Sequence, residues 1–284
     1  MPGLLLSLLL FQPPAADLRA RLQKLIDSSG AEVAIVMRSL DGSHELTLDG
    51  DKEFHAASTM KVPVMIELFR QAEAGQLSLD ERLPINNAFH SIVDGSVYQL
   101  SVGDDSDAEV YKNIGKTLTL RQLCEAMITV SSNFAANLLI ERVGVENIRR
   151  TVTRLGADGM HVLRGVEDQK AFDKGLNNTT TARALAVLMQ KIAAGEAVSR
   201  KSDAEMVEVL KRQTFKDAIP AGLPADTPIA HKTGTITKIH HDAAIVYGPR
   251  PYVLVVLVRG IEDQTKSAAL IAAISREVWN EVNR

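Results

Sequence analysis

The chain has one cysteine, Cys124, among its 284 residues, so no intrachain disulfide can form and no cysteine cluster can hold a metal. Aromatic residues are also scarce at 4%, against 45% hydrophobic and 24% charged residues. This balance is that of an ordinary soluble globular protein of one or two domains, long enough to form a packed core without cross-links. Cys124 lies on the apolar face of a helical pattern, so we expect a buried structural thiol.

An excess of positive charge is missing too, since 32 Lys and Arg stand against 35 Asp and Glu, for a net charge of −3. Such a chain has no basic field for nucleic acid or an anionic membrane, and neither is an expected partner.

No stretch of the sequence reaches the roughly 18 apolar residues of a membrane span. The longest run, Leu4–Phe11, has the length of a signal-peptide core, and the small residues Ala15 and Ala16 follow it. We therefore predict a signal peptide over residues 1–16 and a secreted or periplasmic protein. The first cationic residue is only Arg19, so a hydrophobic N-terminal arm is the alternative.

Hydrophobic periodicity separates the two ends of the chain from its middle. The ends predict helices at 17–29 and 266–283 and strands at 32–40, 44–48, 228–235, 243–247 and 252–259. The middle predicts helices at 64–73, 120–130, 134–143, 145–155, 181–194 and 204–211. We predict an α/β (α+β) fold in which a five-stranded antiparallel sheet with flanking terminal helices receives an inserted all-α lobe. The domain is 17–284, with an α/β lobe at 17–57 and 226–284, an α lobe at 58–225, and a site where the lobes meet.

One polar stretch, residues 86–116, is too long for an ordinary connection and predicts a surface excursion of the α lobe. Its acidic run, Asp104–Asp107, is typical of a solvated charged surface. Tyr98 and Tyr111 are either ordinary surface aromatics or residues that border a pocket.

Ser58 stands at a predicted strand-to-helix junction, with Lys61 three residues later on the same helical face. A neutral or proton-sharing lysine can take the serine proton and so make the hydroxyl a nucleophile. By chance this pair occurs about once in a chain of this length. Alone it is more typical of a capped helix with a solvated lysine.

Two further clusters could face the same pocket. In the predicted strand around Lys232, alternation sends Lys232 and Gly234 to one face and Thr233 and Thr235 to the other. Gly234 leaves room for a ligand beside the backbone, and Lys232 can attract an anion, although a polar strand end has the same composition. The segment Ser131–Asn133 falls between two helical patterns, where a helix cap is the simpler interpretation.

Taken together and in order, Ser58-Thr59-Met60-Lys61, Ser131-Ser132-Asn133 and Lys232-Thr233-Gly234 resemble the S-x-x-K, S-D-N and K-T-G motifs of class A β-lactamases and penicillin-binding proteins. Residues 127–139 and the threonine run at 178–182 extend the resemblance over nearly everything after the leader. It implies a monomeric serine β-lactamase that acts on a small β-lactam, confers antibiotic resistance, and needs no cofactor or metal.

The resemblance also implies a role for each motif residue. Ser58 is the acylated nucleophile, Lys61 its proton partner, Ser131 the proton donor to the leaving nitrogen, and Glu167 the base for deacylation. Asn133 holds the substrate's side-chain amide, Lys232, Thr233 and Thr235 bind its carboxylate beside Gly234, and the N–H groups of Ser58 and Thr235 form the oxyanion hole. Asp168 is the next candidate base.

Several positions depart from the family pattern and put fast deacylation in doubt. Ala171 stands where an asparagine usually helps to fix the water, the loop from Glu167 to Thr179 is about two residues short, and Asn178 replaces the aspartate partner of Arg164. Ser132 replaces the aspartate of S-D-N. The alternatives are thus a penicillin-recognising peptidase, amidase or esterase with slow deacylation, or a non-catalytic β-lactam-binding sensor.

The strand arginine that often helps to hold the carboxylate in this family is missing as well. His240, His241 and Asp242 stand in its place. We expect the two histidines to be solvated at a strand turn, with substrate or metal binding as the alternative.

Overall fold

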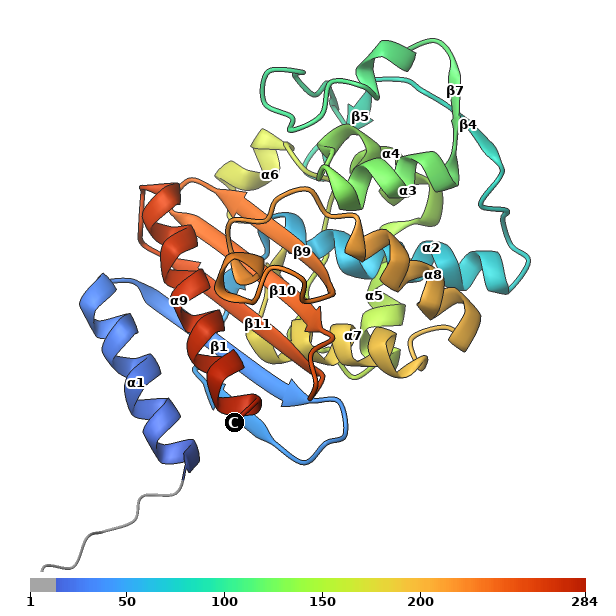
Figure 1. The fold of residues 1–284 in the computed structure, drawn as a ribbon. Coiled ribbons are helices and arrows are strands. Elements are labelled where there is room, and N and C mark those ends of the chain that lie inside the picture. The colour runs from blue at the N-terminus through green and yellow to red at the C-terminus, as the bar shows by residue number, and fades with distance from the viewer. Residues whose placement is uncertain (1–13) are drawn as a thin grey trace, which may run out of the picture.

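In the computed structural model of the protein, which describes residues 14–284, five antiparallel strands form the central sheet in the order β2-β1-β11-β10-β9 (Figure 1). The strands are β1 (Glu32–Ser39), β2 (Glu45–Leu48), β9 (Ile229–Ile236), β10 (Ile239–Val246) and β11 (Tyr252–Arg259). This topology confirms the predicted sheet. Residues 1–13, most of the predicted signal peptide, lie outside the described part of the chain.

Helices cover both faces of the sheet. The terminal helices α1 (Pro14–Ser29) and α9 (Gln264–Val282) pack side by side on one face, and α7 (Ala182–Ala194) covers the other (Figure 1). Because successive side chains point to opposite faces, neighbours such as Ile35 and Val36 enter different hydrophobic cores. A sheet buried on both faces explains why β11 reads as a nearly continuous apolar run.

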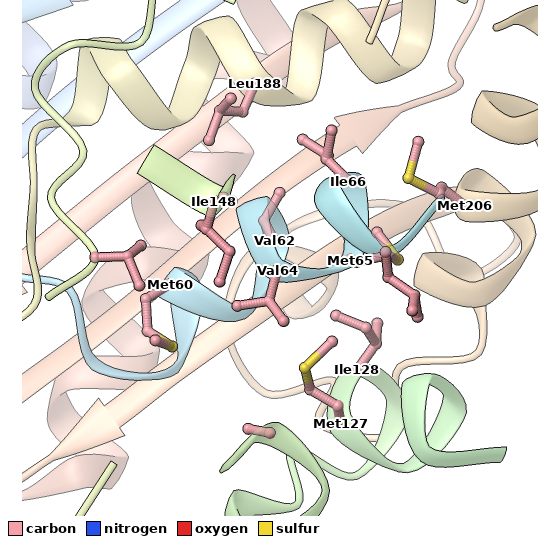
Figure 2. Packing of buried hydrophobic residues seen from close by; sticks show 14 of the residues in the cluster. Met60, Val62, Val64, Met65, Ile66, Met127, Ile128, Ile148, Leu188 and Met206 are labelled. Atoms are coloured by element: carbon pink, nitrogen blue, oxygen red, sulfur yellow. The ribbon is translucent and has the colours of Figure 1, made fainter. Parts of the chain in front are cut away.

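The α lobe is built around α2 (Lys61–Glu73), which is apolar on nearly all sides. Figure 2 shows Val62, Val64, Met65 and Ile66 of this helix among side chains from the surrounding helices. The labelled neighbours come from α3 (Leu120–Thr129), α5 (Val145–Arg154), α7 and α8 (Arg200–Lys211), and α4 (Asn133–Val143) also packs against α2. The buried Cys124 on α3 confirms the expectation of a structural thiol.

Three two-stranded pairs complete the lobe and hold its long connections. The pairs are β3 (Phe54–His55) with β8 (Thr179–Thr180), β4 (Arg82–Pro84) with β7 (Thr117–Thr119), and β5 (Phe89–His90) with β6 (Val97–Tyr98). The last two pairs and the 3-10 turn η2 (Tyr111–Asn113) give structure to the polar excursion. Further short helices are η1 (Ala57–Met60), η3 (Ile219–Gly222) and α6 (Gln169–Asp173).

The two largest differences between predicted and observed boundaries are four residues each. The strand β10 begins at Ile239, before the predicted start at 243, because its first residues are polar yet buried. The expectation that the adjacent histidines are solvated is therefore wrong, since His240 is 4% exposed and His241 0%. Helix α8 begins at Arg200 instead of 204, where Ser199 caps it.

No helix among residues 14–284 is both long enough and apolar enough to cross a membrane.

Candidate active site

The 3-10 turn η1 places Ser58 between the sheet and the α lobe. The edge strand β9 passes so close to this turn that a Cβ on Gly234 would lie 3.0 Å from the backbone nitrogens of Ser58 and Thr59. Glycine is therefore required for the approach of the two segments. A cavity of about 300 Å³ opens at their junction, and its lining includes Ser58, Ser131, Asn133, Thr233 and Thr235.

Lys61 begins α2 and is fully buried. Its Nζ donates to the carbonyl of Ser131 at 2.6 Å, to Oδ1 of Asn133 at 2.7 Å and to Oγ of Ser131 at 3.3 Å. Burial lowers the pKa of Lys61 to about 7, against the opposing effect of Asp105 and Glu167. A lysine with this pKa can serve as a base near neutral pH.

Ser131 lies between two buried lysines. Lys232 Nζ donates to Ser131 Oγ at 3.0 Å and to the carbonyl of Thr233 at 2.8 Å. The pKa of Lys232 is well below its usual value because of burial and the nearby Lys61. Ser131 also has a left-handed backbone, with φ of 60°, which a non-glycine residue keeps only when its surroundings hold it. The arrangement connects Lys61, Ser131 and Lys232 in one hydrogen-bonded network.

Glu167 reaches the same place from the loop that precedes α6. Its Oε1 accepts a hydrogen bond from Asn133 Nδ2 at 2.8 Å, and its backbone φ is 62°. Burial raises the pKa of Glu167, and Asp105 adds to the rise, while the Asn133 bond and Lys61 oppose it. A second cavity of about 340 Å³ brings Glu167, Asn133 and Ser58 onto one lining.

Asp168, the other candidate base, is occupied by structural contacts. Its carboxylate accepts hydrogen bonds from Ser91 Oγ at 2.9 Å, Ile92 N at 3.0 Å and Ala171 N at 3.1 Å. These bonds join the excursion to the cap of α6 and leave Glu167 as the better-placed carboxylate.

Comparisons with known proteins agree with this geometry. Residues 17–282 match the family model described as Beta-lactamase enzyme family. The chain belongs to this family. It is 28% identical to a beta-lactamase of Bacillus licheniformis over 179 residues, a match that covers 61% of this chain and 58% of that protein.

Two solved structures show the same fold over nearly the whole chain. An ancestral class A beta-lactamase is 28% identical with a TM-score of 0.80, covering 93% of this chain and 99% of that one. The structure of PBP-A is 27% identical with a TM-score of 0.79, covering 93% and 95%. The chain thus has the fold of beta-lactamases and penicillin-binding proteins.

The loop that carries Glu167 is held without the ion pair that the family pattern predicts. The Arg164 guanidinium donates to Leu176 O at 2.8 Å, Gly165 O at 2.9 Å and Asn177 Oδ1 at 3.2 Å. Asn178 Oδ1 accepts from the backbone of Arg164 at 3.1 Å, and its Nδ2 donates to the Arg164 carbonyl at 3.0 Å. Carbonyl and amide oxygens thus surround Arg164 in place of the aspartate that the resemblance predicts.

The side of the cavity toward α9 carries Thr233, Thr235 and His240 where the family often has an arginine. The Nδ1 of His240 has no hydrogen-bond partner among the described residues. His241, in contrast, is structural, because its Nδ1 accepts from Val258 N at 3.1 Å and its Nε2 donates to His55 O at 2.9 Å. Burial lowers the pKa of His241 to about 4, so the ring is neutral.

The His231–Asp242 pair was not predicted. His231 Nδ1 lies 3.0 Å from the Asp242 carboxylate, both side chains are buried, and Asp242 also accepts from Ile219 N at 3.1 Å. The pair ties the two strands to η3. The polar residues at the start of β10 could have indicated such a pair, because polar side chains in a buried strand need hydrogen-bond partners.

Asp105 was assigned to a solvated run, and this expectation is wrong for that residue. Its carboxylate accepts hydrogen bonds from the backbone of Asn133 and of Phe134, each at 2.9 Å. These partners lie 28 and 29 residues from Asp105, so no local pattern in the sequence pointed to the contact.

Proposed function

We propose that the protein is a serine β-lactamase that opens the β-lactam amide through an acyl-enzyme on Ser58. The observation that carries the proposal is the hydrogen bond from Asn133 to Glu167, on a cavity lining that includes Ser58. A carboxylate fixed beside the nucleophile is what hydrolysis of an acyl-enzyme requires. Residues 17–284 would form the catalytic domain, and antibiotic resistance would be its consequence.

In acylation, Ser58 Oγ bonds to the lactam carbonyl carbon while its proton passes to Lys61. The N–H groups of Ser58 and Thr235 stabilise the oxyanion, at a few kcal/mol per donor. As the carbon–nitrogen bond breaks, the nitrogen takes the hydroxyl proton of Ser131, which the neighbouring lysines replace. The substrate carboxylate lies toward Lys232, Thr233 and Thr235.

In deacylation, Glu167 takes a proton from a water molecule, whose oxygen bonds to the acyl carbon. The ester bond to Ser58 Oγ breaks, and the proton that Glu167 took passes to Ser58 Oγ, which restores both groups. Asn133, which holds both Glu167 and Lys61, connects the two steps.

One feature favours a second candidate, a penicillin-recognising peptidase, amidase or esterase that deacylates slowly. Ala171 is fully buried and offers no side-chain hydrogen bond to a water beside Glu167. On this reading the protein would react with penicillin and keep the adduct.

The experiment compares hydrolysis of a chromogenic cephalosporin by the wild type, Ser58→Ala and Glu167→Gln. We expect turnover only in the wild type, and intact mass spectrometry should show a lasting adduct on Glu167→Gln and none on Ser58→Ala. Equal rates for the wild type and Ser58→Ala would refute the proposal. A lasting adduct on the wild type, without turnover, would establish the slow-deacylating alternative.

A further inference from the structure

Two consecutive residues of the polar excursion contact the chain on both sides of Ser131. On the near side, Ser106 Oγ donates to the carbonyl of Val130 at 2.7 Å. On the far side, Asp105 accepts the backbone N–H groups of Asn133 and Phe134. Residues distant in sequence thus hold Val130, directly before the proposed proton donor, and Asn133 and Phe134, two and three residues after it.

The contacts of Asp105 complete the N-terminus of α4. The first four N–H groups of a helix have no partner inside it. Asp105 takes those of Asn133 and Phe134, the Ser132 side chain takes that of Ala135 at 3.3 Å, and the Ala126 carbonyl takes that of Ser132, the N-cap residue, at 3.0 Å. A carboxylate is favourable here, because a helix N-terminus carries partial positive charge.

Asp105 is itself held in place. The Tyr111 hydroxyl donates to its Oδ2 at 3.2 Å, and the Tyr111 ring packs against Phe134 with ring centroids 4.7 Å apart. The backbone of Asp107 donates to its Oδ1 at 3.3 Å. The excursion therefore presents a carboxylate of fixed orientation.

The residues held by these contacts, Ser131 and Asn133, each make several hydrogen bonds whose geometry depends on the local backbone. Ser131 keeps its left-handed backbone while its carbonyl accepts from Lys61 and its hydroxyl from Lys232. Asn133, two residues on, bonds Lys61 and Glu167. A small rotation at the start of α4 would move all of these atoms.

We propose that Asp105 and Ser106, here called the Asp105–Ser106 clamp, position Ser131 and Asn133 for acylation, with Asp105 supplying the carboxylate that residue 132 lacks. This role rests on the proposed function. Through these contacts the polar excursion would position catalytic groups, and Ser106 also lines the cavity of about 300 Å³.

The test measures the rate of acylation by a fluorescent penicillin, with thermal unfolding of every variant. In Asp105→Asn, an amide group faces backbone donors that need an acceptor. Since misplacement of a catalytic group by about 1 Å can cost 100-fold, we expect acylation to fall about 10- to 100-fold in the folded protein. Ser106→Ala should also lower the rate of acylation.

Moving the carboxylate separates positioning from general stability. Ser132→Asp alone puts a second carboxylate beside Asp105, whose Oδ2 is 3.4 Å from Ser132 Oγ, so repulsion should lower the rate. Asp105→Ser alone should lower it as well. Because aspartate is as good a helix cap as serine, the double variant Asp105→Ser/Ser132→Asp should recover at least tenfold over Asp105→Ser.

Glu109→Gln is the matched control, since it removes one negative charge from the same excursion at an exposed side chain. It should be acylated at the wild-type rate. Wild-type acylation of Asp105→Asn, or a double variant no faster than Asp105→Ser, would overturn the clamp and leave the proposed function standing. A wild type that takes no label at all would instead refute the proposed function, and the clamp's role with it.

Discussion

At the scale of single residues, the site depends on two titratable side chains, Lys61 and Lys232, that are buried away from water. Lys61 and Lys232 are both 0% exposed, and burial lowers the pKa of each. Two adjacent lysines would repel each other if both were charged, so the site favours a shared proton. Burying the two amines lowers the free energy of unfolding, and their hydrogen bonds to Ser131 and Asn133 partly offset this loss.

The lowered pKa of Lys61 predicts the pH dependence of acylation. The free amine forms above the pKa, so in Glu167→Gln, where deacylation is blocked, the acylation rate should rise with pH to a plateau. The midpoint should lie at or just below about 7, because removal of the Glu167 charge lowers the pKa of Lys61 further. Stopped-flow labelling with a fluorescent penicillin would measure it.

In the same assay Lys61→Arg should lose the rise, since a guanidinium stays protonated. Lys211→Arg on the exposed face of α8 is the control and should keep the profile of Glu167→Gln. A rate independent of pH between 5 and 9 would contradict a base role for Lys61.

At the scale of elements, α4 connects the nucleophile side of the site to the loop of Glu167. Asn133 lies in its first turn, and Asn137 in the next turn holds the loop through both backbone groups of Val166. Val166 N donates to Asn137 Oδ1 at 2.7 Å, and Asn137 Nδ2 donates to Val166 O at 3.0 Å. Glu167 is thus fixed from the residue beside it.

Asn137→Ala should therefore slow deacylation more than acylation. Both bonds to Val166 are lost, so Glu167 is free to shift, and we expect deacylation to fall about 10- to 100-fold and acylation to change only a few-fold. The lifetime of the adduct, followed by intact mass spectrometry, measures deacylation, and labelling by a fluorescent penicillin measures acylation. Asn147→Ala on α5, an amide far from the loop, should behave as the wild type, and an equal fall in both rates would show that Asn137 acts otherwise.

The sequence predicted elements whose evidence is local and missed those that depend on distant partners. The apolar runs of β1 and β11 mark buried strands by themselves, and the three motifs predict candidate residues that line one cavity in the structure. The start of β10 was missed because His241 and Asp242 are buried through bonds to His55, Val258, His231 and Ile219. The role of Asp105 was missed for the same reason, since its partners lie 28 and 29 residues away.

At the scale of the whole molecule, the sheet belongs to both hydrophobic cores. One core joins its inner face to the α lobe, and the other joins its outer face to α1 and α9. The α lobe is inserted between the strands β2 and β9, so the sheet is assembled from two separate stretches of the sequence. Packing that shares a sheet in this way favours unfolding as one unit.

Leu185→Ala tests this coupling. Leu185 on α7 is fully buried in the inner core, so its truncation should cost about 2–5 kcal/mol in the free energy of unfolding. The single tryptophan, Trp279 on α9, packs against the outer core. In urea, Trp279 fluorescence and far-UV circular dichroism should shift to the same lower midpoint, although the substitution lies across the sheet. Ile114→Ala, at a side chain 49% exposed, should change the midpoint little. A Trp279 transition that stays at the wild-type midpoint while the dichroism shifts would mean that the two lobes unfold separately.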